Sequence, residues 1–247
     1  MAHFVGTALK GLALALAALL ISGIAPISCD AQTNPTITFT WDAPASTNFS
    51  GYYVYYRTAA GAYSAANRFQ VASSSATTYS TTALAAGTYY FRITAYSPIA
   101  ESTPSNEVTV YSFSPSLQRG SAANRPYLVE IFSAGTSTTI ISQTITSNAS
   151  GLVRVNANSA LPATFDLRVK TALFLGRKFT GRSISNTATL TALLIGDLDG
   201  NNAIDAADWN TLKADYYQSG RSSDLNSDSI TNGADASYLT ANWGSGQ

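Results

Sequence analysis

Short runs of alternating apolar and polar residues, separated by clusters of turn-forming residues, fill much of the chain after residue 32. Four of these runs lie at Ile37–Trp41, Tyr52–Arg57, Tyr89–Tyr96 and Val108–Tyr111. A period of two is typical of strands that have one buried and one exposed face. The runs therefore predict a small antiparallel sandwich over residues 33–113.

A second group of alternating runs follows residues 114–125, a stretch rich in Ser, Pro, Gly and Asn that we interpret as a linker. These runs lie at Tyr127–Phe132, Thr139–Thr146, Leu152–Val155, Phe165–Lys170 and Ala188–Leu193. They predict a second sandwich over residues 126–193. The predicted fold class is mostly β: two small antiparallel β-sandwiches followed by a small α-helical module at residues 194–247.

The pattern changes in residues 194–247, where a 12-residue arrangement of oxygen-bearing side chains occurs twice. Positions 1, 3, 5, 9 and 12 are Asp197, Asp199, Asn201, Asp205 and Asp208 in the first copy, and Asp224, Asn226, Asp228, Asn232 and Asp235 in the second. Calcium takes six or more oxygen ligands, and a main-chain carbonyl at position 7 completes such a loop, here Ala203 and Ile230. The sequence therefore predicts two bound calcium ions.

Each loop is followed by a segment with helical spacing. Trp209, Leu212 and Tyr216 stand at i, i+3 and i+7, and Leu239 and Trp243 occupy the matching later positions of the second copy. We expect each helix to present one apolar stripe to the other. The first loop has four Asp ligands and the second has three, which predicts tighter calcium binding in the first loop.

Several motifs of the first region resemble a bacterial fibronectin type III domain. They are Thr38–Asp42, GYYVYYR from Gly51, LAAGTYYFRITAYS from Leu84, and Glu101–Val108. In the second region LPATFDLRVK from Leu161, followed by Phe174-Leu175, resembles the transthyretin-like or carboxypeptidase-regulatory-like sandwiches of bacterial surface proteins. Both resemblances imply β-sandwich folds.

The paired loops resemble a type I dockerin, because position 12 is Asp where an EF-hand has Glu and the residues before Asp197 look like a strand. That resemblance implies a cohesin-like protein as partner. Two features depart from the family pattern. Position 6 is Asn202 and Ser229 instead of Gly, and positions 10 and 11 are Ala206-Ala207 and Gly233-Ala234 instead of the frequent Ser-Thr.

Strand alternation also predicts an outward-facing row of tyrosines on two neighbouring strands of the first sandwich: Tyr53, Tyr55, Tyr90 and Tyr96. Tyrosines with an apolar face and a polar tip suit the stacking of a polysaccharide or contact with a protein. The alternative is that the rings pair across the strands and only stabilise the sheet.

The N-terminus has the features of an export signal. Lys10 precedes an apolar run that is too short to span a membrane, and small residues before Gln32 predict a cleaved signal peptide at residues 1–31. The protein is then extracellular or at the cell surface. A lipid anchor on Cys29 is the alternative.

The charge distribution and the missing residue types narrow the function. The net charge is zero, so nucleic acid is not an expected partner. Residues 114–193 carry eight basic and two acidic side chains, whereas residues 194–247 carry two basic and eight acidic ones. The basic side chains suit an acidic polysaccharide, the acidic neighbouring module, or solvent. They are Arg154, Arg168, Lys170, Arg177, Lys178 and Arg182.

Enzymatic activity is not expected. His3 and Cys29 are the single histidine and cysteine, and both lie in the predicted signal peptide. A Ser-His, Cys-His or His-metal site is therefore excluded from the mature chain. Two hypotheses remain: a calcium-binding surface or matrix adhesion protein, or a dockerin-bearing accessory component of an extracellular, cellulosome-like complex that degrades polysaccharide.

Overall fold

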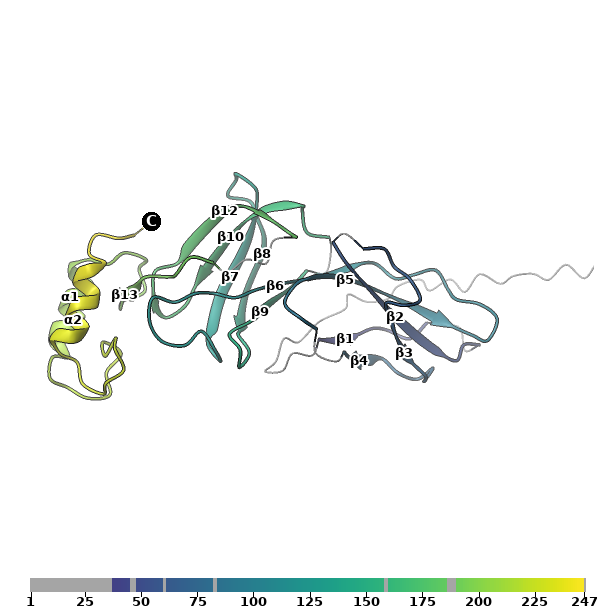
Figure 1. Cartoon of the computed structure of the whole chain (residues 1–247), viewed down its shortest axis with the longest axis horizontal. Helices are drawn as coiled ribbons and strands as arrows, with labels where there is room; N and C mark the ends of the chain where they lie inside the picture. The colour runs from purple at the N-terminus through teal and green to yellow at the C-terminus, as the bar shows by residue number, and fades with distance from the viewer. Residues whose placement is uncertain are drawn as a thin grey trace, which may run out of the picture.

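The computed structural model describes residues 37–44, 48–59, 61–81, 84–157, 160–185 and 190–246. The chain forms an elongated molecule with β-sheets along most of its length and two short helices at one end (Figure 1). The mostly β fold class is confirmed. The predicted signal peptide and Cys29 lie outside the described residues. Within the described residues no helix has the length and apolar character needed to cross a membrane.

The first sandwich packs a two-stranded sheet against a five-stranded one. The first sheet pairs β1 (Thr38–Thr40) with β4 (Thr78–Ser80). The second has the order β3 (Arg68–Val71), β2 (Gly51–Thr58), β5 (Thr88–Tyr96), β6 (Val108–Phe113) and β9 (Val153–Ala157). Its buried core confirms the predicted inward positions, which include Tyr52, Val54, Phe91, Ile93 and Ala95.

The second core lies against a four-stranded sheet with the order β12 (Arg177–Ser183), β10 (Thr164–Lys170), β7 (Pro126–Ser133) and β8 (Thr139–Thr146). Strand β6 contributes to both cores through its opposite faces. Val108 and Val110 belong to the first core, whereas Tyr111 and Phe113 belong to the second. The Tyr111 ring contacts the Phe165 ring edge-on, with centroids 5.2 Å apart.

The two sandwiches therefore share a sheet across the boundary predicted at residues 113 and 114. Strand β9, expected in the second sandwich, pairs antiparallel with β6, with Val155 opposite Tyr111. Arg154 on β9 donates a hydrogen bond to the Leu84 carbonyl of the first sandwich at 2.7 Å. The sequence pattern showed both strands but gave no information about which partner each would take.

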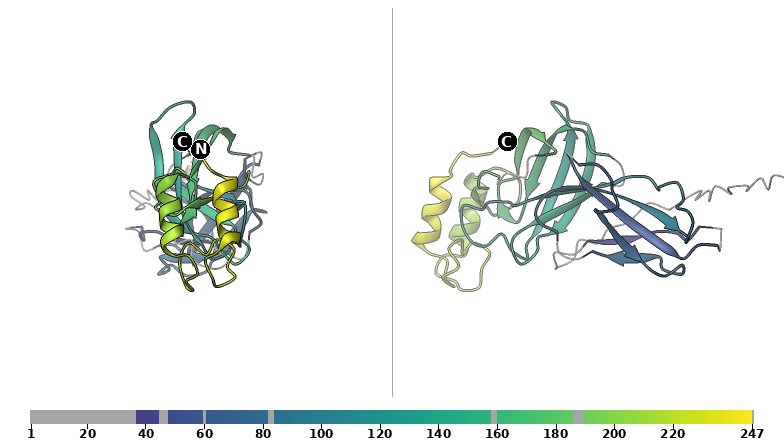
Figure 2. Two further views of the ribbon diagram at one scale, coloured as in Figure 1. Left: turned by 90° about the vertical axis from the view of Figure 1, so that its left-hand side faces the viewer. Right: turned by 45° about the vertical axis from the view of Figure 1, so that its right-hand side comes forward.

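The C-terminal part contains two helices, α1 (Ala206–Ala214) and α2 (Gly233–Ala241), which lie side by side (Figure 2). It joins the second sandwich through the pairing of β11 (Leu173–Phe174) with β13 (Ile195–Asp197). The second core continues into this part and includes Ile204, Leu212, Leu225 and Leu239. The sandwich and the helical part are thus built around one continuous core.

Four strands were missed and one was misplaced by the sequence pattern. Strands β3, β4 and β12 were not predicted, because much of their length is polar or exposed. Strand β11 was not predicted because it is only two residues long. The predicted strand Ala188–Leu193 is wrong over residues 190–193, where only Leu193 forms an isolated bridge, to Leu117. Residues 186–189 lie outside the described residues. The strand occurs two residues later, as β13.

Candidate metal centre

Each of the two predicted loops brings three carboxylates together. Ligand oxygens of the first group lie within 4.8 Å of one another, as do those of the second. The first group is Asp197, Asp199 and Asp208, and the second is Asp224, Asp228 and Asp235. These residues hold positions 1, 3 and 12 of the first loop and positions 1, 5 and 12 of the second.

The start of each helix fixes the end of each loop. Position 9 is the N-cap of the helix, so Asp205 accepts a hydrogen bond from the Ala207 N–H at 2.8 Å. Position 12 lies three residues later, and Asp208 accepts from the Asp205 N–H at 2.9 Å. Asn232 and Asp235 make the same capping box in the second copy. A buried carboxylate is thereby held at position 12 of both loops.

The other oxygen of the position 12 carboxylate holds the start of the loop. In the first copy Asp208 Oδ1 accepts from the Leu198 N–H at 2.7 Å and from the Asp199 N–H at 3.2 Å. In the second copy Asp235 Oδ1 accepts from the Asn226 N–H at 2.9 Å. Asp208 and Asp235 are fully buried. The carboxylate at position 12 therefore shapes the loop from both ends.

Positions 4 and 6 of both loops adopt left-handed backbone. The φ angles are +81° at Gly200 and +72° at Asn202, and +60° at Ser227 and +79° at Ser229. This turn directs the position 6 N–H at the carboxylate of position 1. Asn202 donates to Asp197 Oδ2 at 3.2 Å, and Ser229 donates to Asp224 Oδ2 at 2.8 Å. Asn and Ser thus take the conformation that Gly adopts more easily.

The first loop contains a buried oxygen that has no partner in the described residues. Asp197 is 2% exposed, and its Oδ1 atom accepts no hydrogen bond. An unsatisfied buried carboxylate oxygen is costly, and a hard cation bound there would satisfy it. The donor set, which consists of carboxylate, amide and main-chain oxygens, matches the preference of calcium. The residues therefore fit the predicted ion.

The carboxylate at position 5 of the second loop is also shaped by its neighbours. The Asn226 side-chain amide and the Ile230 N–H donate to Asp228 at 2.8 and 3.0 Å. These donors, the Asn226 amide first, hold the pKa of Asp228 below its usual range. Asp228 is therefore ionised and available as an oxygen ligand at neutral pH.

Main-chain hydrogen bonds join each loop to the segment that follows the helix of the other copy. Ile204 in the first loop donates to the Ser245 carbonyl at 2.8 Å, and the equivalent Thr231 donates to the Gln218 carbonyl at 3.0 Å. Residues 218 and 245 each follow the helix of the opposite copy. Isolated bridges between Ala203 and Gly246, and between Ser219 and Ile230, repeat this exchange. The two copies therefore form one unit with an internal two-fold relation.

The expected apolar stripes between the helices are only partly present. Leu212 and Leu239 are fully buried. Trp209, Tyr216 and Trp243 are 37%, 37% and 49% exposed, so these three aromatic rings are not buried as the stripes predicted. Each helix therefore buries one leucine of its predicted stripe.

The prediction that the four tyrosines of the row are exposed is wrong. Tyr55 and Tyr90 are each 8% exposed, whereas Tyr53 and Tyr96 are half-buried and stack with ring centroids 4.2 Å apart. Tyr90 belongs to the buried cluster of the second core. Burial raises the pKa of the Tyr55 and Tyr90 phenols.

Arginines and acidic residues cover the tyrosine row further. The Arg57 guanidinium lies 4.0 Å from the Tyr90 ring centre, and that of Arg68 lies 3.7 Å from the Tyr53 ring centre. Glu101 accepts hydrogen bonds from the Tyr55 hydroxyl at 2.9 and 3.0 Å. These contacts favour the structural interpretation of the row. A ligand-binding role for the four tyrosines stays a prediction.

Several basic residues of the second sandwich are paired within the chain. Arg168 pairs with Glu130 at 2.9 Å, and Lys178 pairs with Asp166 at 3.2 Å. The Gly181 N–H and Lys178 hold the pKa of Asp166 below its usual range. Lys170 pairs with Asp197 of the first loop at 2.5 Å. Lys170 therefore contacts the acidic neighbouring module, which is one of the three alternatives given above for the basic residues.

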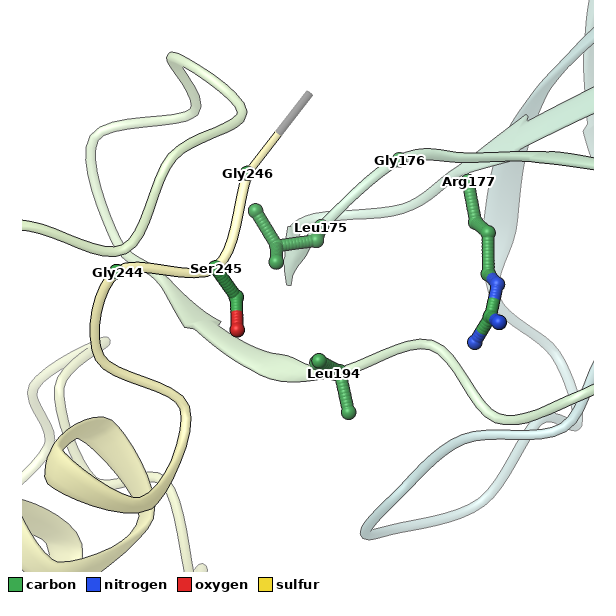
Figure 3. Close-up of a pocket in the computed structure, with 7 residues that line it drawn as sticks. All are labelled: Leu175, Gly176, Arg177, Leu194, Gly244, Ser245 and Gly246. Carbon is green, nitrogen blue, oxygen red and sulfur yellow. The ribbon is translucent and has the colours of Figure 1, made fainter.

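A cleft of about 310 Å³ lies where the second sandwich meets the end of the helical part (Figure 3). Its lining is Leu175, Gly176, Arg177, Leu194, Gly244, Ser245 and Gly246. Among the described residues that line it, Arg177 is the one with a charged side chain.

Comparison with known proteins identifies the first region. Residues 23–111 match the family model of the fibronectin type III domain. The chain contains a fibronectin type III domain. The match ends within β6, the strand that the domain shares with the second core. No curated protein matches the chain.

Solved structures share only a loose likeness with the chain. A C-terminal interface mutant of a type II cohesin–X-dockerin complex from Acetivibrio cellulolyticus has 16% identity and a TM-score of 0.42, covering 56% of this chain and 96% of that chain. A segment of two fibronectin type III domains from chicken tenascin has 14% identity and a TM-score of 0.28, covering 62% and 97%. These similarities are too low to support an inference about function.

Proposed function

We propose that this protein is an exported, non-catalytic interaction protein whose C-terminal module binds two calcium ions. The observation that carries the proposal is the unpartnered Oδ1 atom of Asp197, buried within a loop whose carboxylates converge. The second loop repeats the same capping box and left-handed turn. Calcium is a hard cation that prefers oxygen ligands, so it suits such a pair of loops better than a softer metal would.

The rest of the chain supports a role in positioning the module. The fibronectin type III domain and the second sandwich share a sheet, and the second sandwich shares a core with the module. The sandwiches thus form a support that holds the calcium loops at one end of an elongated molecule (Figure 1). We propose a transthyretin-like or regulatory-like family for the second sandwich and an extracellular or cell-surface location for the protein.

The test is a calorimetric titration of the chain with calcium after removal of divalent ions. Two binding events are expected, and the melting temperature should be higher in millimolar calcium than in chelator, because the ions bind only the folded loops. At 100 times the dissociation constant each site adds about 2.7 kcal/mol. Asp208→Ala, which removes the buried carboxylate of the first loop, should abolish one binding event. A chain that melts identically in chelator and calcium would contradict the proposal.

A dockerin-like role in a polysaccharide-degrading assembly is the second candidate. It is favoured by the free outer surface of the helices, where Ala206, Ala207, Gly233 and Ala234 at loop positions 10 and 11 are all exposed. Trp209 on α1 and Trp243 just after α2 are also exposed. Calcium-dependent retention of the chain on an immobilised cohesin would favour this candidate. Retention on a polysaccharide or a cell surface instead would favour adhesion.

A further inference from the structure

A lysine of the second sandwich reaches into the first calcium loop. Lys170 lies at the end of β10, and its ammonium group donates to Asp197 Oδ2 at 2.5 Å. It also donates to the Asn202 side-chain oxygen at 3.3 Å. Asp197 is position 1 of the loop, and Asn202 is position 6. A cation from outside the module thus contacts two residues of the first loop.

The geometry leaves one side of the Asp197 carboxylate for an ion. Its Oδ2 atom accepts from Lys170 and from the Asn202 N–H, whereas its Oδ1 atom is unpartnered. The Asn202 side chain is itself held on the sandwich, because its oxygen accepts from the Gly176 N–H at 2.5 Å. The lysine therefore balances the buried charge of Asp197 without occupying its Oδ1 atom.

The carboxylates of the second loop have no equivalent ion-paired cation among the described residues. Among the described residues, none of the ion pairs involves Asp224, Asp228 or Asp235. Asp224 accepts only main-chain N–H groups, from Asp228 and Ser229. Arg119 contacts this loop through the main chain instead: it donates to the Asn226 carbonyl at 2.8 Å and to the Tyr238 hydroxyl, and its charge acts on Asp228 without forming an ion pair with it. The two copies thus differ in a charge that the 12-residue pattern does not contain.

We propose that Lys170 acts as a built-in counter-cation for the first calcium loop. In the absence of calcium it neutralises Asp197, so the first loop and its junction with the sandwich stay assembled. When calcium binds, the ammonium group repels the ion, so the first loop binds more weakly than the second. This inference rests on the proposed calcium function and reverses the ranking expected from the number of Asp ligands.

The test replaces Lys170 with Met in the full chain and measures each loop separately. Asp224→Ala disables the second loop, and Asp199→Ala disables the first while leaving the Lys170–Asp197 pair intact. Lys170→Met should tighten calcium binding at the first loop by about tenfold or more and leave the second loop unchanged. In chelator its melting temperature should fall by about 5–10 °C, because Asp197 becomes a buried unpaired charge. In saturating calcium the fall should be smaller.

Two further variants separate the charge effect from a loss of packing. Lys178→Met breaks a similar pair on the same sheet, with Asp166, and should lower stability equally with and without calcium. The double variant Lys170→Met with Asp197→Asn should regain stability in chelator and lose binding at the first loop. Unchanged or weaker calcium binding at the first loop of Lys170→Met would overturn the inference. An absence of binding at both loops of the unaltered chain would instead overturn the proposed function.

Discussion

At the scale of single residues, the two acidic loops adopt the same backbone turn with different side chains. Position 6 is left-handed in both, which costs an ordinary L-residue about 1–2 kcal/mol. Asn202 offsets that cost through its hydrogen bond with Gly176 of the sandwich. Ser229 is exposed, and only its main-chain N–H holds the loop. The second loop therefore carries strain that the first compensates.

Replacing Ser229 with Gly should stabilise the protein by about 1 kcal/mol, because Gly adopts a φ of +79° without a steric penalty. Thermal melting in chelator and in calcium measures the effect. The matched control is Ser222→Gly, at a position without positive φ, which should be neutral or slightly destabilising. A lower melting temperature for Ser229→Gly would show that the serine side chain has a role of its own.

At the scale of elements, the strands of the fibronectin type III domain have two buried faces where a single sandwich would have one. Strand β5 places Phe91 and Ile93 in the first core and Tyr90 in the second. Tyr90 lies under Arg57, which pairs with Glu107 at 3.0 Å. Tyr63 donates to Glu107 at 2.7 Å, and burial is the first cause that raises the pKa of Tyr63. The row of tyrosines is thus largely covered by other side chains of the same chain.

Tyr90→Ala should therefore destabilise the protein by about 3 kcal/mol or more, as expected for loss of a buried aromatic side chain. Tyr53→Ala, which removes a half-buried ring that stacks on Tyr96, should cost only about 1 kcal/mol. Urea unfolding of both variants measures the difference. Equal losses in the two variants would mean that Tyr90 is no more buried in solution than Tyr53.

At the scale of the whole molecule, the predicted domain boundaries fall inside continuous structure. Residues 114–125, interpreted as a linker, contact the helical module. Gln118 donates to the Leu193 carbonyl and accepts from the Asn242 side-chain amide at 2.7 Å. Asn242 also donates to the Ile195 carbonyl at 2.7 Å. This polar network, in which Asn242 is buried and Gln118 is exposed, ties the linker, β13 and the end of α2 together.

The second sandwich and the calcium module should therefore unfold in one cooperative transition. Differential scanning calorimetry of the chain should show that chelator shifts this transition to a lower temperature without splitting it, because both parts share one core. Asn242→Ala should shift the same transition downward, since it leaves Gln118 and the Ile195 carbonyl without their buried partner. A separate early transition that appears only in chelator would show that the module unfolds alone.

Local sequence determined the features that depend on neighbouring residues in the chain. The strand periods predicted β2, β5, β7, β8 and β10, and the spacing of oxygen-bearing side chains predicted the two acidic loops. Capping, turn conformation and alternation act over a few residues, so they can be read from the chain itself. The left-handed turn at position 6 is likewise local, and it is present in both loops.

Contacts between distant segments were decided only by the tertiary structure. Two of these contacts, the pairing of β9 with β6 and the hydrogen bond of Lys170 to Asp197, join residues 27 or more positions apart. A third feature, the burial of Tyr90, covers a strand face that alternation alone predicts to be exposed. Alternation shows that a residue points out of one sheet, but only packing shows whether another layer covers it. Likewise, the 12-residue pattern gives the ligands of a loop, whereas the charge placed beside it comes from another strand.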